Sequence, residues 1–429
     1  MIAQHSLVAL ALTYAVCTIL TALASQWRLF NTAVSDYLSG DILTWIIDRS
    51  PESDSPLVYT QSDRFCNMYL QFIDDINPGI IFILNMISTA LAILIVGACG
   101  NALRKKSGNF AAALIALNPL FWMLALGPSK EPALVVLCSV SLALIMNVRL
   151  PWPLWMAAGL MCIQAFFYRM EFGCAVAFGT VLILLVRRLG FETWNCRILI
   201  GASLSAMTLI PIALKTSDAL AKNRTSLVAD GTFEMFASLT PSNTGEVSVG
   251  ISQRLARSVW TAPLGVGYRL VVSVVRAPLR PVLKSNDGRI PLYSVFLWLT
   301  EFIVTFGGIA ALIILATRKN CHEYGKTIAG LVCALAVLIG CYPIVQTRYF
   351  VPLTPFMLIL IFMLKAPVQF RLVIVITTLA LIGPVLLALL GHLPAPNQNH
   401  DLPADGNPYL NPWIEPVTSI PHQDQNRQG

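Results

Sequence analysis

The chain has 429 residues, of which 56% are hydrophobic and only 12% are charged, and its mean hydropathy is +0.69. That composition excludes an ordinary soluble globular protein, in which roughly a quarter of the residues are charged, and it indicates a polytopic membrane protein. The net charge of +7 is explained largely by Lys and Arg in short loops between apolar runs, so we expect no nucleic-acid partner.

Apolar runs long enough to cross a membrane recur along most of the chain. A bilayer core about 30 Å thick needs a helix of roughly 20 apolar residues, and the sequence contains about eleven such runs. The predicted fold class is therefore all-α, with a bundle of transmembrane helices. The runs begin near Ser6, Pro78, Phe110, Pro132, Leu154, Phe172, Ile198, Pro291, Thr327, Val351 and Leu372.

The breaks between the runs alternate in charge. Because short cytoplasmic loops carry an excess of Lys and Arg, the alternation predicts a cytoplasmic N-terminus and an extracytoplasmic C-terminus. The basic breaks contain Arg104, Lys105 and Lys106; Arg149; Arg187, Arg188 and Arg197; Arg318, Lys319 and Lys326; and Lys365 and Arg371.

On this topology two large loops, 26–77 and 216–290, lie on the extracytoplasmic side. The first is acidic, and its stretch from Leu57 to Phe72 mixes aromatic and polar residues in the way typical of a helix lying in the membrane interface. We expect one transmembrane domain over 1–392 and a polar, disordered extracytoplasmic tail over 393–429.

The second large loop becomes apolar and basic towards its end. Between Arg254 and Lys284 it carries six basic residues, Arg276 and Arg280 among them, and no acid. This pattern is typical of an interfacial segment that contacts lipid phosphates, either those of a specific substrate or those of bulk lipid.

Charged residues gather at the ends of the runs that face outward on this topology. Charges at the membrane rim are costly and usually functional, a carboxylate can act as a base towards a hydroxyl, and arginine matches the geometry of phosphate. Simpler roles remain open: a helix cap at Lys130-Glu131, an ion pair between Arg169 and Glu171, and snorkelling of Arg348. The four sites are Asp36, Lys130-Glu131, Arg169 with Glu171, and Arg348-Tyr349.

Five segments resemble, in the same order, the motifs of one enzyme family. They are Asp36-Tyr37; Pro78 to Asn85; Asn118-Pro119 followed by Ser129-Lys130-Glu131; Tyr168 to Phe172, where Met170 replaces a common proline; and Gln346 to Pro355. The family is that of the C-type-fold (GT-C-like) integral-membrane glycosyltransferases, which use polyprenyl-phosphate-linked sugars and include relatives in exopolysaccharide assembly. The resemblance covers roughly Met1 to Arg371.

One departure from the family concerns the acid. Many members carry a paired acid in the first outer loop, whereas Asp36 stands alone here and the adjacent pair Asp74-Asp75 lies at the far end of the loop. Which of these acids is essential stays open, and with it any dependence on a divalent cation.

The resemblance and the residues together lead to one hypothesis: transfer of a sugar from a polyprenyl-phosphate or pyrophosphate donor to a glycan or lipid acceptor, in contact with membrane lipids. It implies that Asp36 is the base and that Arg348 binds the donor phosphate. The remaining substrate-binding residues are Lys130, Glu131, Arg169, Glu171, Arg276, Arg280 and Tyr349. The likeness to exopolysaccharide enzymes favours the inner membrane of a bacterium.

Two alternatives remain. A polysaccharide polymerase of O-antigen or exopolysaccharide repeat units, in which both substrates are lipid-linked, shares the topology and suits the long arginine-containing second loop. A lipid-linked sugar transporter or flippase is less favoured. Such proteins commonly show inverted repeats and helices broken near mid-membrane, whereas the charges here cluster at the outer rim.

Overall fold

The computed structural model describes residues 2–25, 79–104, 107–125, 129–188, 264, 292–317, 323–340 and 347–389. Throughout these residues the regular structure is helical and contains no strand, which confirms the all-α prediction for this part of the chain. Each predicted apolar run corresponds to a helix here, except the run near Ile198, which lies outside the described residues.

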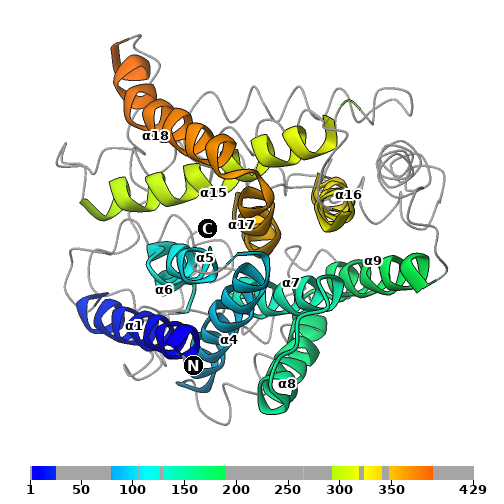
Figure 1. Cartoon of the computed structure of the whole chain (residues 1–429). Helices are drawn as coiled ribbons and strands as arrows, with labels where there is room; N and C mark the ends of the chain where they lie inside the picture. Colours follow the sequence, from blue (N-terminus) through cyan, green and yellow to red (C-terminus); the bar gives the residue numbers. More distant parts are fainter. Residues whose placement is uncertain are drawn as a thin grey trace, which may run out of the picture.

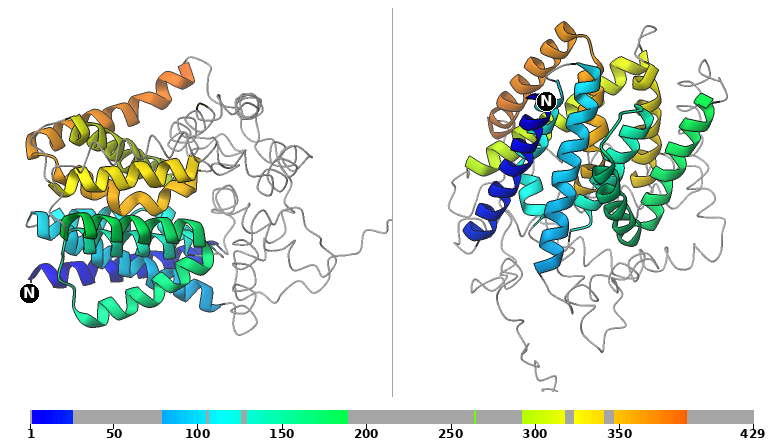
Figure 2. Two further views of the ribbon diagram at one scale, coloured as in Figure 1. Left: turned by 90° about the vertical axis from the view of Figure 1, so that its right-hand side faces the viewer. Right: turned by 60° about the horizontal axis from the view of Figure 1, so that its bottom comes forward.

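The helices run side by side, roughly along one common direction, as Figure 2 shows (left). Their labels are those of Figure 1. In chain order they are α1 (Ile2–Ser25), α4 (Gly79–Leu103), α5 (Ser107–Ala116), α6 (Pro119–Leu124), α7 (Glu131–Ile145), α8 (Trp152–Tyr168), α9 (Met170–Arg188), α15 (Leu292–Thr317), α16 (Glu323–Gly340), the 3-10 helix η3 (Thr347–Leu353), α17 (Thr354–Met363) and α18 (Ala366–Leu389).

The central helix α4 is long and apolar enough to cross a membrane. Its stretch Ile80–Leu103 has a mean hydropathy of 2.5. The other described helices have apolar stretches of 10–17 residues, apart from α6, which is six residues long. Length and composition therefore mark one membrane-span candidate among the described residues, and the count of about eleven crossings stays a prediction.

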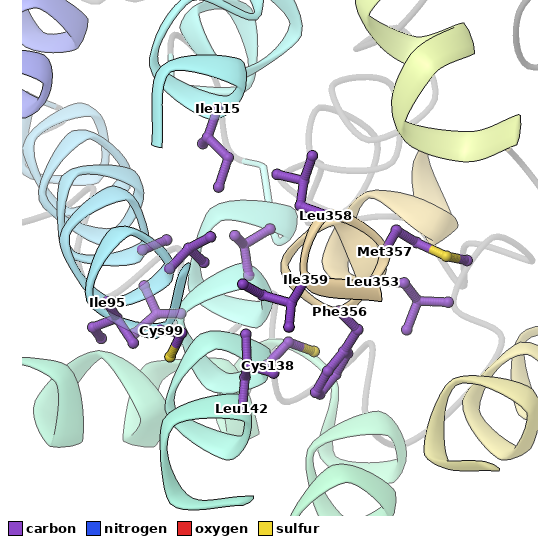
Figure 3. Packing of buried hydrophobic residues seen from close by; sticks show 14 of the residues in the cluster. Ile95, Cys99, Ile115, Cys138, Leu142, Leu353, Phe356, Met357, Leu358 and Ile359 are labelled. Atoms are coloured by element: carbon purple, nitrogen blue, oxygen red, sulfur yellow. The ribbon is translucent and has the colours of Figure 1, made fainter. Parts of the chain in front are cut away.

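The core lies between α4, α7 and α17. Helix α4 packs against α1, α5 and α7, and α17 packs against α15, α4 and α7. Figure 3 shows side chains from these helices pointing toward one another, Cys138 and Leu142 from α7 facing Phe356 and Ile359 from α17. All four are fully buried, so segments far apart in the sequence share one apolar interior.

The predicted run that begins near Phe110 is divided into α5 and α6. Pro119 has no backbone N–H and is favoured in the first turn of a helix, so α6 begins there. The side-chain oxygen of Asn118 accepts a hydrogen bond from the backbone N–H of Leu120 at 3.0 Å, and the indole of Trp122 donates to the carbonyl of Ala116 at 2.8 Å. These bonds satisfy polar groups at the break.

The C-terminal end of α7 is held by backbone and side-chain bonds together. Asn147 has a positive φ of 52°, and the N–H of Val148 donates to the carbonyl of Ala143 at 2.9 Å, the pattern of a Schellman cap. The carbonyl of Ile145 accepts a hydrogen bond from Arg187 at the end of α9. In the same way, Arg104 at the end of α4 donates to the carbonyl of Leu364, the C-cap of α17, at 2.9 Å.

These contacts bring together helix ends that the sequence analysis assigns to one side. Arg104, Arg187 and the segment around Arg149 all come from breaks predicted to be cytoplasmic. The guanidinium of Arg187 also lies 4.4 Å from the ring centroid of Tyr324, near the start of α16. We call the end of the bundle that carries these contacts the basic end.

The outward faces of several helices are apolar. On α8, Trp152, Met156, Leu160 and Ile163 are each more than half exposed, and their spacing of three or four residues places them on one face. Helices α1, α9 and α18 carry similar exposed sets: Val8, Leu12, Val16 and Leu20; Phe178, Val181 and Leu185; and Phe370, Ile374 and Val375.

The crossing of α4 and α5 depends on glycine. A Cβ added to Gly108 would lie 1.9 Å from the carbonyl oxygen of Gly97, and one added to Gly100 would lie 2.7 Å from the Cα of Gly108. The backbone N–H of Gly108 also donates to the side-chain oxygen of Asn101 at 3.2 Å. The two backbones can approach this closely because neither carries a side chain at the contact.

Replacing Gly108 with alanine should therefore destabilise the protein by about 1–3 kcal/mol, because the helices must separate to admit the methyl group. Thermal unfolding in detergent, followed by tryptophan fluorescence, measures the loss as a lower melting temperature. Gly159→Ala is the matched control: an added Cβ in α8 meets nothing within 4 Å, so this variant should melt at or above the wild-type temperature. Equal melting of Gly108→Ala and wild type would contradict the close crossing.

Candidate functional site

The first predicted outer turn leads directly into α7. Lys130 is the N-cap residue, with no side-chain capping bond, and Glu131 and Pro132 form the first helical positions. Glu131 is 1% exposed, and its Oε2 accepts a hydrogen bond from the hydroxyl of Ser129 at 2.6 Å. A carboxylate in the first turn interacts favourably with the helix dipole, so the structure places a buried acid at the start of α7.

The second predicted outer turn is a single residue long. Helix α8 ends at Tyr168 and α9 begins at Met170, and Arg169 between them has φ −152° and ψ 83°. The N–H of Arg169 still donates to Ala165 at 3.0 Å, and its carbonyl accepts from Gly173 at 2.8 Å. Both helices therefore extend their hydrogen bonding to Arg169, and its backbone position is fixed.

A buried polar pair lies directly below this turn. The side-chain amide of Gln164 donates to the phenolic oxygen of Tyr168 at 2.6 Å. Tyr168 is fully buried and Gln164 is 3% exposed. Because buried polar groups need partners, this bond helps to fix the last turn of α8 and, with it, the start of the reversal.

Arg169 contacts the last predicted outer turn. Its guanidinium carbon lies 4.0 Å from the centroid of the Tyr349 ring, within the range of a cation–π interaction. Tyr349 belongs to η3, which packs against α7, α16 and α17. The contact therefore joins the α8–α9 turn to η3, two segments that are far apart in the sequence.

Arginine stacked on an aromatic ring is well suited to binding an anion. The ring fixes the plane of the guanidinium, while the N–H groups lie at the edge of that plane and can bind phosphate oxygens in pairs. Arg348 directly precedes Tyr349 in η3. Arg169 and Arg348, which belong to two of the predicted sites, thus come from segments that contact each other.

The other predicted site residues are described in part or not at all. Glu171 lies in the first turn of α9 and Arg348 lies in η3, and the side chains of both are outside the described structure. Asp36, Arg276 and Arg280 also lie outside the described residues. The proposed roles of Asp36 and Arg348 thus rest on the sequence, whereas the Arg169–Tyr349 contact is a structural observation.

Sequence reasoning missed two features of this end of the bundle. The hydroxyl of Ser129 bonds to Glu131, and Gln164 bonds to Tyr168. The first pair could have been suspected from its spacing, since Ser129 precedes the buried acid by two residues. The second pair has helical i, i+4 spacing, but an apolar run with one Gln does not reveal its partner.

The described residues contain no group of three or more His, Cys, Asp or Glu side chains that could hold a metal ion. The first-loop acids Asp36, Asp74 and Asp75 lie outside that part of the chain. Whether the protein uses a divalent cation therefore depends on those acids.

Comparisons of the chain with protein-family models, with curated proteins and with solved structures found no match. The function is therefore argued from the residues and their geometry.

Proposed function

We propose that this chain is a polytopic membrane glycosyltransferase that moves a sugar from a polyprenyl-phosphate-linked donor to a glycan or lipid acceptor at the extracytoplasmic face. The observation that carries the proposal is the contact between Arg169 and Tyr349. It draws together two of the four charged sites that the sequence places at outward helix ends.

Membrane insertion is supported by the surface of the bundle. Helices α1, α8, α9 and α18 each expose several large apolar side chains over the part whose side chains the structure describes. Apolar surface on this scale is unfavourable in water and marks contact with lipid or a partner. The basic end fits a cytoplasmic location, because cytoplasmic loops carry an excess of Lys and Arg. The end that carries the buried Glu131 and the stacked Arg169 would then face the extracytoplasmic side.

The proposed reaction needs a base and a cation. The acceptor hydroxyl oxygen attacks the anomeric carbon of the sugar while the bond between that carbon and the phosphate oxygen breaks. The hydroxyl proton passes to the carboxylate of Asp36, and the bonding electrons leave with the phosphate. Arg348 binds the departing phosphate, because positioned cations stabilise negative charge that grows in the transition state.

The described residues have supporting roles in this scheme. Arg169, stacked on Tyr349, adds a second cation beside η3. Glu131, buried at the start of α7, shapes the pocket together with Lys130 and Glu171. Arg276 and Arg280, in the second outer loop, are proposed to contact donor phosphate.

The test uses the purified protein in detergent with a radiolabelled polyprenyl-phosphate sugar and a glycan extract as acceptor. The proposal expects a labelled glycan and release of polyprenyl phosphate. Absence of turnover with every lipid-linked sugar tried, together with an unchanged set of glycans in cells lacking the protein, would contradict it.

The nearest alternative is a polysaccharide polymerase. Chain-length analysis of the surface glycans of cells that lack the protein distinguishes it from a transferase. A polysaccharide polymerase is favoured by the arginines between Arg254 and Lys284, which suit a large lipid-pyrophosphate substrate. Its loss should leave single repeat units, whereas loss of a transferase should remove one sugar from the glycan.

A further inference from the structure

Arg187, which is half-buried at the basic end, has an incomplete set of hydrogen-bond partners. One terminal nitrogen of Arg187, Nη1, donates to the carbonyl of Ile145, and the guanidinium lies over the ring of Tyr324. The other, Nη2, is shielded from solvent and has no hydrogen-bond partner within the described structure. A shielded donor without an acceptor is costly, the more so on a charged group.

The charge of Arg187 is also uncompensated by the side chains that the structure describes. Its two contacts are a neutral carbonyl and an aromatic ring, and no acid among these side chains forms an ion pair with it. A half-buried cation with one shielded donor is stabilised by an anion that supplies both the opposite charge and the missing acceptor.

The surroundings of Arg187 are rich in positive charge. Three helix ends meet here, because Arg187 near the end of α9 contacts both Ile145 at the end of α7 and Tyr324 at the start of α16. Arg149 follows α7, Arg188 ends α9, and Lys326 lies in the first turn of α16; the first two are exposed. The only acidic residue in these segments is Glu323, the first residue of α16.

We infer that this junction binds the phosphate of an anionic phospholipid from the cytoplasmic leaflet. The phosphate lies between the exposed side chains of Arg149 and Arg188, and the guanidinium of Arg187 rotates so that Nη2, which lacks an acceptor in the described structure, donates to a phosphate oxygen. Exposed apolar side chains on α9, such as Leu185 and Val181, lie next to the same end and offer a surface for the acyl chains. The inference rests on the proposed insertion in the membrane, with the basic end inward, and is independent of sugar transfer.

The experiment measures binding of short-chain phosphatidylglycerol to the full chain in detergent by native mass spectrometry, with short-chain phosphatidylcholine as comparison. The wild type should prefer phosphatidylglycerol. The double variant Arg149→Gln, Arg188→Gln should bind it about 30-fold more weakly, since each cation near a phosphate contributes about 1 kcal/mol and the two contributions add. Both side chains are exposed, so the variant should fold as the wild type does.

Arg371→Gln is the matched control. Arg371 is an exposed arginine of α18, which lies far from α9 in Figure 1, and its loss should leave the binding unchanged. Equal binding of the two lipids by the wild type, or equal weakening in the control and the double variant, would overturn the site.

Arg187→Gln provides a second readout. It removes the donor to the carbonyl of Ile145 and should lower the melting temperature in both lipids, but phosphatidylglycerol should no longer raise the melting temperature above that in phosphatidylcholine. Inorganic phosphate is added in a further arm. If it displaces phosphatidylglycerol at millimolar concentration, the site takes a free anion and the lipid assignment is wrong; if it does not, the assignment stands. Failure of sugar transfer leaves all these outcomes unaffected.

Discussion

Replacing Asp36 with asparagine should lower the rate of sugar transfer roughly 10²–10⁴-fold, the usual loss when a positioned general base is removed. The amide is nearly the same size as the carboxylate, so membrane expression should not change. The rate is measured with purified protein and a labelled lipid-linked sugar, and the amount of protein in the membrane is measured alongside.

Matched variants in the same loop decide whether the effect is specific to Asp36. Asp54→Asn removes another acid of the first outer loop and should keep wild-type activity. Asp74→Asn and Asp75→Asn test the adjacent acid pair. If either of these abolishes transfer while Asp36→Asn does not, the base has been assigned to the wrong acid, and the dependence on a divalent cation should be measured with a chelator.

Replacing Arg348 with alanine should cost roughly 10²–10³-fold in turnover, because removal of one group that stabilises transition-state charge has an effect of this size. Arg348→Lys keeps the charge but loses the paired N–H groups, so its activity should lie between alanine and wild type. Turnover at saturating donor and the donor KM separate loss of chemistry from loss of binding.

The control for this series is Arg371→Ala, which removes an exposed arginine from the start of α18, at the end predicted to be cytoplasmic. It should leave turnover unchanged. If Arg348 only reaches toward bulk headgroups, Arg348→Ala should have activity close to that of this control, and the proposed role in binding the donor phosphate would be wrong.

The sequence predicted the helices well because their main determinant is local. In a membrane, which is the proposed location, an apolar run with few charges would form a helix irrespective of its neighbours. The described helices begin close to the predicted starts, as at Pro132 and Leu154. The divided run at Asn118-Pro119 was not predicted, although proline is the residue that ends one helix and begins the next. The mean hydropathy of a run includes the residues on both sides of such a break, so it does not reveal where one helix ends and the next begins.

One contact between the predicted outer turns is present in the structure, whereas the site itself stays a prediction. The predicted topology placed Arg169 and Tyr349 on the same side of the membrane, and the structure brings these two side chains into contact. The sequence could not predict that the ring stacks on the guanidinium, since this depends on how η3 packs against α7 and α17. The burial of Glu131 and its bond to Ser129 likewise depend on tertiary packing, which charge alternation does not describe.

The central claim is that the first-loop acid and the late arginine share one cavity on the extracytoplasmic side. The most direct measurement is crosslinking between cysteines placed at Asp36 and Arg348, in a background in which the ten native cysteines are replaced. A short membrane-impermeant bifunctional thiol reagent, added to intact cells, should join the two positions, and a lipid-linked donor should slow the reaction. Two cysteines that label only from the cytoplasm, or that label from outside but do not crosslink, would contradict the account.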